Sequence, residues 1–186
     1  MDLMKYNPII DIEVGARVPD FILVDEKDKT IRLSDLRGSP AVLYFYPKDS
    51  SAGCTQEACD FRDVYHDFRE LDCAIYGISP DTKEDHEIFS QENDLPFELC
   101  VDPDLNMVKA FGVWGEYQLT EQEAEVAKSF GFKVDDNLKT WSVVRSTFLI
   151  DKDGILMHKW VNVNFRGHAS SVRDQLNTSF KFDIAF

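Results

Sequence analysis

The sequence is poor in positive charge and has no long apolar run. Its 20 lysine and arginine residues are outnumbered by 34 aspartate and glutamate residues, which gives a formal net charge of −14 at pH 7. A surface this acidic repels phosphate groups, so neither nucleic acid nor an anionic membrane is an expected partner. No apolar run approaches ~18 residues, and the first residues do not have the pattern of a signal peptide, a basic segment followed by an apolar one. We therefore expect a cytoplasmic protein that does not enter a membrane.

Cysteine is scarce as well. The 186 residues include four cysteines, Cys54, Cys59, Cys73 and Cys100. Four are too few for a disulfide scaffold at this length, so they indicate an intracellular protein with mostly reduced thiols. No C-x-x-C pair occurs, and His66 and His86 fall on predicted helices without partner motifs, so we expect no zinc site. Internal repeats and low-complexity segments are also missing, which favours a single domain.

The most informative stretch runs from Pro47 to Cys59. Residues 41–46 before it are apolar and rich in aromatic and β-branched side chains, which predicts a buried strand. After it, apolar residues recur at helical spacing, which predicts a helix beginning near Thr55. Cys54 then lies where a strand leads into a helix N-terminus. Unpaired N–H groups and the helix dipole favour a thiolate there.

The rest of the chain alternates strands with helices. We predict further strands or hairpins at 21–24, 30–33, 73–79, 97–101, 143–150 and 155–161, with helices at 82–92 after an Asp81 cap, around 107–111 and at 168–177. This order indicates an α/β fold, a central mixed sheet flanked by helices on both faces.

Two stretches stand apart from that alternation. The segment 115–142 is long, and its Thr120–Glu123 capping box predicts a helix ending near Gly131. Residues 180–186 carry apolar side chains at every second position, which is typical of a strand. This tail has three candidate partners: the weakly alternating strand-like segment 10–14, the sheet edge, or another subunit.

Pro47, Ser51 and Cys54 fit the peroxiredoxin pattern of proline, three residues, Thr or Ser, two residues, cysteine. The runs 44–49 and 53–62 resemble the subfamily called bacterioferritin comigratory protein, or peroxiredoxin Q. This resemblance extends over about residues 15–180. It implies a thioredoxin-like fold and a thiol-dependent peroxidase that reduces hydrogen peroxide and organic hydroperoxides without metal, haem or flavin. We accordingly divide the chain into an extension (1–14), a peroxiredoxin domain (15–180) with an insertion at about 115–142, and an apolar tail (181–186).

The resemblance also implies the site. Cys54 would be the peroxidatic nucleophile, with Pro47, Ser51 and Arg145 completing the pocket. A lowered thiol pKa alone is a weak source of rate: a fall from ~8.5 to ~6 gives roughly 30-fold more thiolate but costs about 13-fold in nucleophilicity. Most of the rate must come from donors that stabilise the breaking O–O bond. The Arg145 guanidinium supplies charge and a planar fork of donors, and the Ser51 hydroxyl can orient the peroxide.

Cys59 lies where this subfamily often carries its resolving cysteine. In an intact helix residues i and i+5 have Cα atoms roughly 8.7 Å apart, and a disulfide tolerates at most ~7 Å. Resolution by Cys59 therefore requires the first helical turns to unwind. Cys100 is the second candidate and a single-cysteine mechanism the third, while Cys73 is interpreted as structural. Ala52 stands where the family usually has proline, which loosens the loop by about 0.5–1 kcal/mol.

The expected partners are a peroxide and a thioredoxin or similar thiol reductant, acting on a monomer or weak homodimer. Two alternatives stay open at this point. A thiol–disulfide oxidoreductase would keep the fold and act on protein disulfides, although the C-x4-C spacing differs from C-x-x-C. A non-enzymatic binding or holdase module would use the same fold with inert sulfurs.

Overall fold

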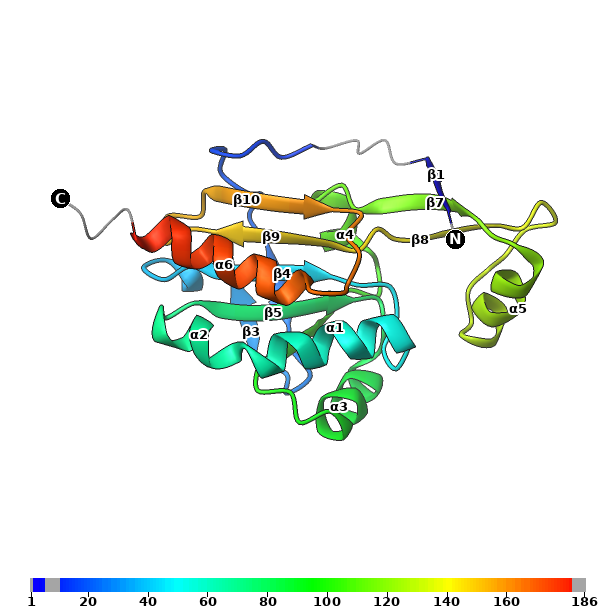
Figure 1. Cartoon of the computed structure of the whole chain (residues 1–186), viewed down its shortest axis with the longest axis horizontal. Helices are drawn as coiled ribbons and strands as arrows, with labels where there is room; N and C mark the ends of the chain where they lie inside the picture. The colour runs from blue at the N-terminus through cyan, green and yellow to red at the C-terminus, as the bar shows by residue number, and fades with distance from the viewer. Residues whose placement is uncertain (1, 6–10, 182–186) are drawn as a thin grey trace.

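The computed structural model describes residues 2–5 and 11–181. At its centre is a five-stranded mixed sheet in the spatial order β10, β9, β4, β5, β6; Figure 1 labels the first four of these strands. These strands are β10 (Leu156–Val161), β9 (Ser146–Ile150), β4 (Ala41–Phe45), β5 (Ala74–Ser79) and β6 (Glu98–Val101). The strands β4, β5 and β6 are parallel, whereas β9 is antiparallel to both β4 and β10. The predicted mixed sheet is confirmed.

Both faces of this sheet are covered, which explains why β4 is apolar at every position. Val42 and Tyr44 point into one core and Leu43 and Phe45 into the other, as the alternation of a strand requires. The first core is closed by α1 (Ala52–Asp63), α2 (Tyr65–Glu70), α3 (Lys83–Glu92) and α6 (His168–Lys181). The second core is closed by the hairpin of β2 (Ile22–Val24) and β3 (Thr30–Arg32), the 3₁₀ turn η1 (Leu33–Leu36) and α4 (Asn106–Ala110).

The long segment 115–142 is ordered around a second sheet. The strands of this second sheet are β1 (Asp2–Lys5), β7 (Trp114–Gln118) and β8 (Lys139–Val143), and neighbouring strands are antiparallel. Helix α5 (Glu121–Ser129) connects β7 to β8 and lies at the end of the molecule away from the central sheet (Figure 1). The predicted capping box of Thr120 and Glu123 is present, so this helix is confirmed. The strands β1 and β7, and β8 apart from Val143, were not predicted.

Several boundaries differ from the sequence-based predictions. Helix α1 begins at Ala52, three residues before Thr55, because Ser51 already has extended cap geometry. Thr82, and not Asp81, caps α3, since the Thr82 hydroxyl accepts from the N–H of Asp85. The Asp81 carboxylate instead accepts from the Ser79 hydroxyl at 2.7 Å.

Of the predicted strand 143–150, residues 146–150 form β9 and Val143 ends β8, while the N–H of Val144 donates to the carbonyl of Val113 and Arg145 lies in the break between the two strands. Residues 11–14 form no strand in the described structure, and position 10 lies outside it. Of the predicted strand-like tail, residues 180 and 181 are the end of α6, and 182–186 lie outside the described residues. Among the described residues, no helix is both long and apolar enough to span a bilayer.

Candidate active site

Cys54 is the third residue of α1, directly after the loop that leaves β4. Ser51 precedes the helix with φ −73° and ψ 143°, and the first intrahelical bond runs from Thr55 N–H to the Ser51 carbonyl at 2.9 Å. The N–H groups of this first turn, that of Cys54 included, therefore have no partner within the helix. They present donors and the positive end of the helix dipole beside the sulfur.

Arg145 contacts the sulfur. Its Nη2 donates to Cys54 Sγ at 3.2 Å, and its Nη1 forms an ion pair with the Glu57 carboxylate. Arg145 occupies the break between β8 and β9, which aims its side chain at α1 across the end of the sheet. Glu57 lies three residues after Cys54, so both groups face the guanidinium from one side of the helix. The predicted pairing of Cys54 with Arg145 is thus present.

The site places one half-buried cation, Arg145, between the buried Glu57 carboxylate and the buried Cys54 sulfur. The exposed fractions are 1% for Cys54 and 0% for Glu57. Burial raises the pKa of Glu57, and the neighbouring Arg145 works against that shift. Burial also lowers the pKa of Arg145, but Glu57 and Cys54 outweigh it and raise the pKa further above its usual value. The guanidinium therefore stays charged at any working pH.

Pro47 and Ser51 lie beside this pair. The Ser51 hydroxyl donates to the Lys48 carbonyl at 2.9 Å, which leaves its oxygen lone pairs to accept from an incoming molecule. Pro47, Ser51, Gly53 and Arg145 all border a cavity of about 480 Å³. Cys54 does not border this cavity itself, but Arg145, whose Nη2 contacts the Cys54 sulfur, does. Four of the five predicted site residues are therefore gathered at one place, with Cys59 apart from them.

A buried polar network that the sequence analysis missed holds the loop before α1. The Asp49 carboxylate lies 2.6 Å from His86 Nδ1 and accepts from the Tyr46 hydroxyl at 2.7 Å, while the Asp49 N–H donates to Asp81 at 2.8 Å. Burial lowers the pKa of His86, but the Asp49 carboxylate outweighs it, so the pKa is raised. The one available signal was a histidine three residues before Phe89 on the apolar face of α3.

Phe165 also reaches the site from the loop before α6. Its ring centroid lies 5.8 Å from the Arg145 guanidinium carbon. A Cβ atom added to Gly53 would meet this ring at 3.1 Å, so glycine permits the close approach. Spacing along the sequence predicts neither the contacts of Phe165 with Arg145 and Gly53 nor the ion pair between Glu57 and Arg145. Glu57 was nonetheless visible as a lone charge on the apolar face of α1, beside Ala58 and Phe61.

The other sulfurs lie elsewhere, and all four cysteines are unpaired. Cys59 is half-buried on α1, and its sulfur lies 3.6 Å from Asn93 Oδ1 at the end of α3. Cys73 and Cys100 are buried, and burial raises the pKa of both thiols. Of the three, Cys59 is the thiol that is accessible and shares an element with Cys54.

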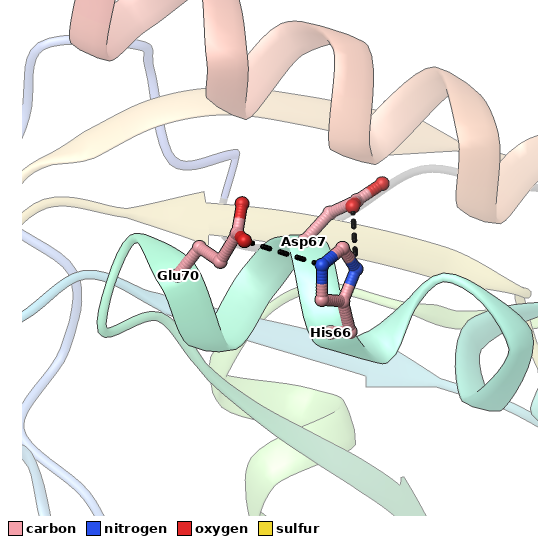
Figure 2. A group of neighbouring side chains, drawn as sticks. All are labelled: His66, Asp67 and Glu70. Carbon is pink, nitrogen blue, oxygen red and sulfur yellow. Dashed lines mark ion pairs between the residues drawn. The ribbon is translucent and has the colours of Figure 1, made fainter.

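His66, Asp67 and Glu70 form a group of metal-ligand type on α2 (Figure 2), although no partner motif was predicted for His66. His66 Nδ1 lies 2.9 Å from Asp67 and Nε2 lies 3.2 Å from Glu70. The Asp67 carboxylate also faces Arg173 at 3.6 Å. Each imidazole nitrogen thus faces its own carboxylate on an exposed surface, which is the geometry of ion pairs.

The AhpC/TSA family model matches residues 14–159, so the chain belongs to the AhpC/TSA family, the peroxiredoxins, and is a thiol-dependent peroxidase. It is 41% identical over 165 residues to the peroxiredoxin Bcp of Bacillus subtilis, covering 89% of this chain and 95% of that one. The putative peroxiredoxin bcp of Coxiella burnetii is 35% identical over 170 residues, 90% of this chain and 100% of that one.

Solved structures agree with this assignment. The bacterioferritin comigratory protein of Xanthomonas campestris, studied for its alkyl peroxide reduction, superposes with a TM-score of 0.75 at 28% identity, covering 90% of this chain and 97% of that one. A peroxiredoxin Q mutant from Xylella fastidiosa gives a TM-score of 0.76 at 25% identity, covering 91% and 98%. The expected thioredoxin-like fold is therefore confirmed.

Proposed function

We propose that Cys54 is the peroxidatic cysteine, that Pro47, Ser51 and Arg145 complete its site, and that Cys59 resolves the oxidised sulfur. The observation that carries this proposal is the 3.2 Å contact between Arg145 Nη2 and Cys54 Sγ in the first turn of α1. Hydrogen peroxide and organic hydroperoxides are the substrates. A thioredoxin-like dithiol is the reductant.

In the first step the Cys54 thiolate attacks one oxygen of the peroxide. An S–O bond forms, the O–O bond breaks, and the leaving oxygen takes a proton and departs as water or an alcohol. Cys54 becomes a sulfenic acid. Arg145 and the first-turn N–H groups stabilise the charge on the departing oxygen, and Ser51 accepts a hydrogen bond from the bound peroxide.

In the second step the Cys59 sulfur attacks the Cys54 sulfenic acid, forming a disulfide and releasing water. Both cysteines lie on α1, at a spacing of roughly 8.7 Å between Cα atoms in a regular helix. The first turns must unwind before the bond forms. A dithiol reductant then exchanges with the disulfide and is itself oxidised. Cys100 is a poorer resolver, because it is buried on β6 and its thiol pKa is raised by burial.

We also propose a monomer or weak homodimer working in the cytoplasm. Both reacting sulfurs belong to one helix, so the disulfide does not require a second chain. Unpaired thiols and recycling by a thiol reductant suit a reducing compartment.

Peroxide consumption by reduced protein tests the proposal, with Cys54→Ser, Cys59→Ser and the wild type assayed in parallel. We expect Cys54→Ser to consume no peroxide. Cys59→Ser should complete one turnover and hold sulfenic acid on Cys54, which a dimedone adduct followed by peptide mass spectrometry detects. Cys73→Ser is the matched control and should behave as wild type.

Two results would contradict the assignment. Undiminished peroxide consumption by Cys54→Ser would remove Cys54 from the chemistry. An unchanged intramolecular disulfide in Cys59→Ser would transfer the resolving role to another thiol. Reduction of insulin without peroxide would instead indicate a thiol–disulfide oxidoreductase.

A further inference from the structure

The cavity beside the site is much larger than hydrogen peroxide needs. Its volume is about 480 Å³, whereas one water molecule takes roughly 30 Å³ in the liquid. Pockets of roughly 300–1,000 Å³ are typical of sites for organic molecules. A second cavity of about 660 Å³ shares Pro47, Lys48, Phe130 and Phe132 with the first, so the space continues beyond the site.

The wall opposite the loop and first turn of α1 comes from the segment 115–142. Apolar side chains of this segment form most of that wall: Leu119, Val126, Ala127, Phe130 and Phe132. Val126 and Phe130 are exposed by 57% and 37% and border the same cavity as Leu119, Ala127 and Phe132, so the apolar surface of this wall is contiguous, as in ligand-binding grooves. The facing wall is the loop and first turn that hold Pro47, Ser51 and Gly53.

The charged groups that border this cavity are each engaged elsewhere. Lys48 forms an ion pair with Asp81, and Arg145 holds Glu57 and the Cys54 sulfur. The Glu123 carboxylate accepts from the Thr120 N–H at 2.8 Å in the capping box. The space therefore offers mainly apolar contact, with Arg145 and the first turn of α1 on the side nearest Cys54.

We propose that this cavity is a subsite for the alkyl or aryl group of an organic hydroperoxide, with α5 and the residues after it as the wall that selects the substrate. The inference rests on the proposed function, because the peroxide group of such a substrate must lie against Cys54 and Arg145. Its organic group then points away from α1, along the apolar side chains of 119–132. Hydrogen peroxide has no group to place there and gains nothing from this wall.

Chain-length dependence of kcat/KM tests the subsite. We expect kcat/KM for linear alkyl hydroperoxides from ethyl to octyl to rise over that for hydrogen peroxide, by up to about fourfold per methylene, and to level off when the cavity is full. Dithiothreitol serves as reductant in these assays, so that no protein partner has to dock.

Val126→Glu places a charge on the apolar wall at an exposed position. It should lower kcat/KM for the octyl substrate about tenfold and leave that for hydrogen peroxide within twofold. Phe130→Ala, which removes wall area without adding charge, should shift the preference in the same direction. Ile88→Glu is the matched control, since Ile88 is 54% exposed on α3 and does not border either cavity.

Three results would overturn the subsite. A flat dependence on chain length with intact hydrogen peroxide turnover would refute it and leave the proposed function standing. An equal loss for octyl hydroperoxide and hydrogen peroxide in Val126→Glu would show a general structural effect. If Val126→Glu turned over octyl hydroperoxide normally with dithiothreitol but lost this turnover with thioredoxin, the same wall would be a docking surface for the reductant and not a substrate subsite.

Discussion

At the residue scale, one guanidinium faces two acidic groups. Arg145 donates to the Cys54 sulfur at 3.2 Å and is ion-paired with Glu57, whose exposed fraction is 0%. In a buried setting such hydrogen bonds are stronger than in water. Removing the guanidinium alone would leave a buried carboxylate uncompensated, which typically costs about 3–5 kcal/mol. Rate and stability therefore have to be separated in any test of Arg145.

His168 is a second buried group with an unusual titration. Its Nε2 lies 2.8 Å from the Thr147 hydroxyl, and its ring packs edge-on against Phe61 and Trp160. Burial, and then the charge of Arg145, lower the pKa of His168 to about 4. The folded protein therefore keeps this imidazole neutral where the unfolded chain, with an ordinary histidine pKa of about 6.5, takes up a proton.

This titration predicts how stability depends on pH. The stabilisation present above pH 6.5 is lost as the pH falls through 6.5 toward 4, on the order of 3 kcal/mol in total. In His168→Gln this loss is absent. Urea unfolding of both proteins between pH 7 and pH 4 should show the wild type losing more stability than His168→Gln.

The comparison cancels other titrating groups. His86 has the opposite sign, because its raised pKa gives stability that is lost as pH rises, and it is present in both proteins. Parallel stability curves for wild type and His168→Gln would contradict a neutral, buried His168.

At the element scale, the first turn of α1 is weakly held. Within the part of the chain that the structure describes, Ser51 gives no side-chain cap to this turn and no acidic residue lies in it. A side-chain cap is typically worth about 0.5–2 kcal/mol, and Gly53 costs about 1 kcal/mol relative to alanine. The Cys54–Arg145 bond and the packing of Phe165 against Gly53 are contacts that hold it instead. Oxidation of the Cys54 sulfur alters its hydrogen bond to Arg145, and this favours unwinding of the first turn.

Ala52→Pro should therefore slow the formation of the disulfide. Ala52 is the first residue of α1, where proline removes no helical hydrogen bond, and Ser51 before it already has the extended geometry that proline requires. A stabilisation of the folded turn by about 0.4–1 kcal/mol would lower the unwound fraction about two- to fivefold. Stopped-flow fluorescence should show disulfide formation slowed by that factor.

Overoxidation provides the second readout of Ala52→Pro. A longer-lived sulfenic acid reacts more often with excess peroxide, so sulfinic acid on Cys54 should accumulate at lower peroxide concentrations. Ala52→Gly, which loosens the turn, should shift both quantities the other way. Unchanged rates in both variants would show that unwinding of this turn does not control the reaction.

At the scale of the whole molecule, local patterns predicted the central sheet and the elements around Cys54. The alternation of strands and helices indicated the mixed sheet, and the capping box at Thr120 located α5. Strand β7 was missed because its pairing with β1 joins residues more than a hundred positions apart. The Asp49–His86 pair was missed for the same reason: it joins a loop to a helix 37 residues further along.

The residues of the candidate site also fall into two groups: those that are close in sequence and those that only the fold brings together. Pro47, Ser51 and Cys54 lie within one stretch, so their common location follows from local sequence. Arg145 is 91 residues from Cys54, and spacing along the chain cannot bring the two together; the family resemblance predicted it and the fold provides it. The cavity wall at Val126 and Phe130 depends on how the segment 115–142 packs, which no local pattern specifies.

The central claim is that the Cys54 sulfur, held by Arg145, is the atom that peroxide oxidises. A single-turnover experiment tests it most directly, with the rate of sulfenic acid formation followed by rapid quench and peptide mass spectrometry. The proteins are wild type, Arg145→Lys, and Arg145→Gln combined with Glu57→Gln, which removes the guanidinium without stranding a buried carboxylate. Circular dichroism confirms that each is folded.

Loss of preorganised donors typically costs about 10²–10³-fold in rate. We predict that oxidation maps to Cys54 in all three proteins and is slower by that factor in the double variant, with Arg145→Lys in between because it keeps the charge and loses the planar fork. Oxidation on Cys73 or Cys100, or an undiminished rate without the guanidinium, would contradict the account.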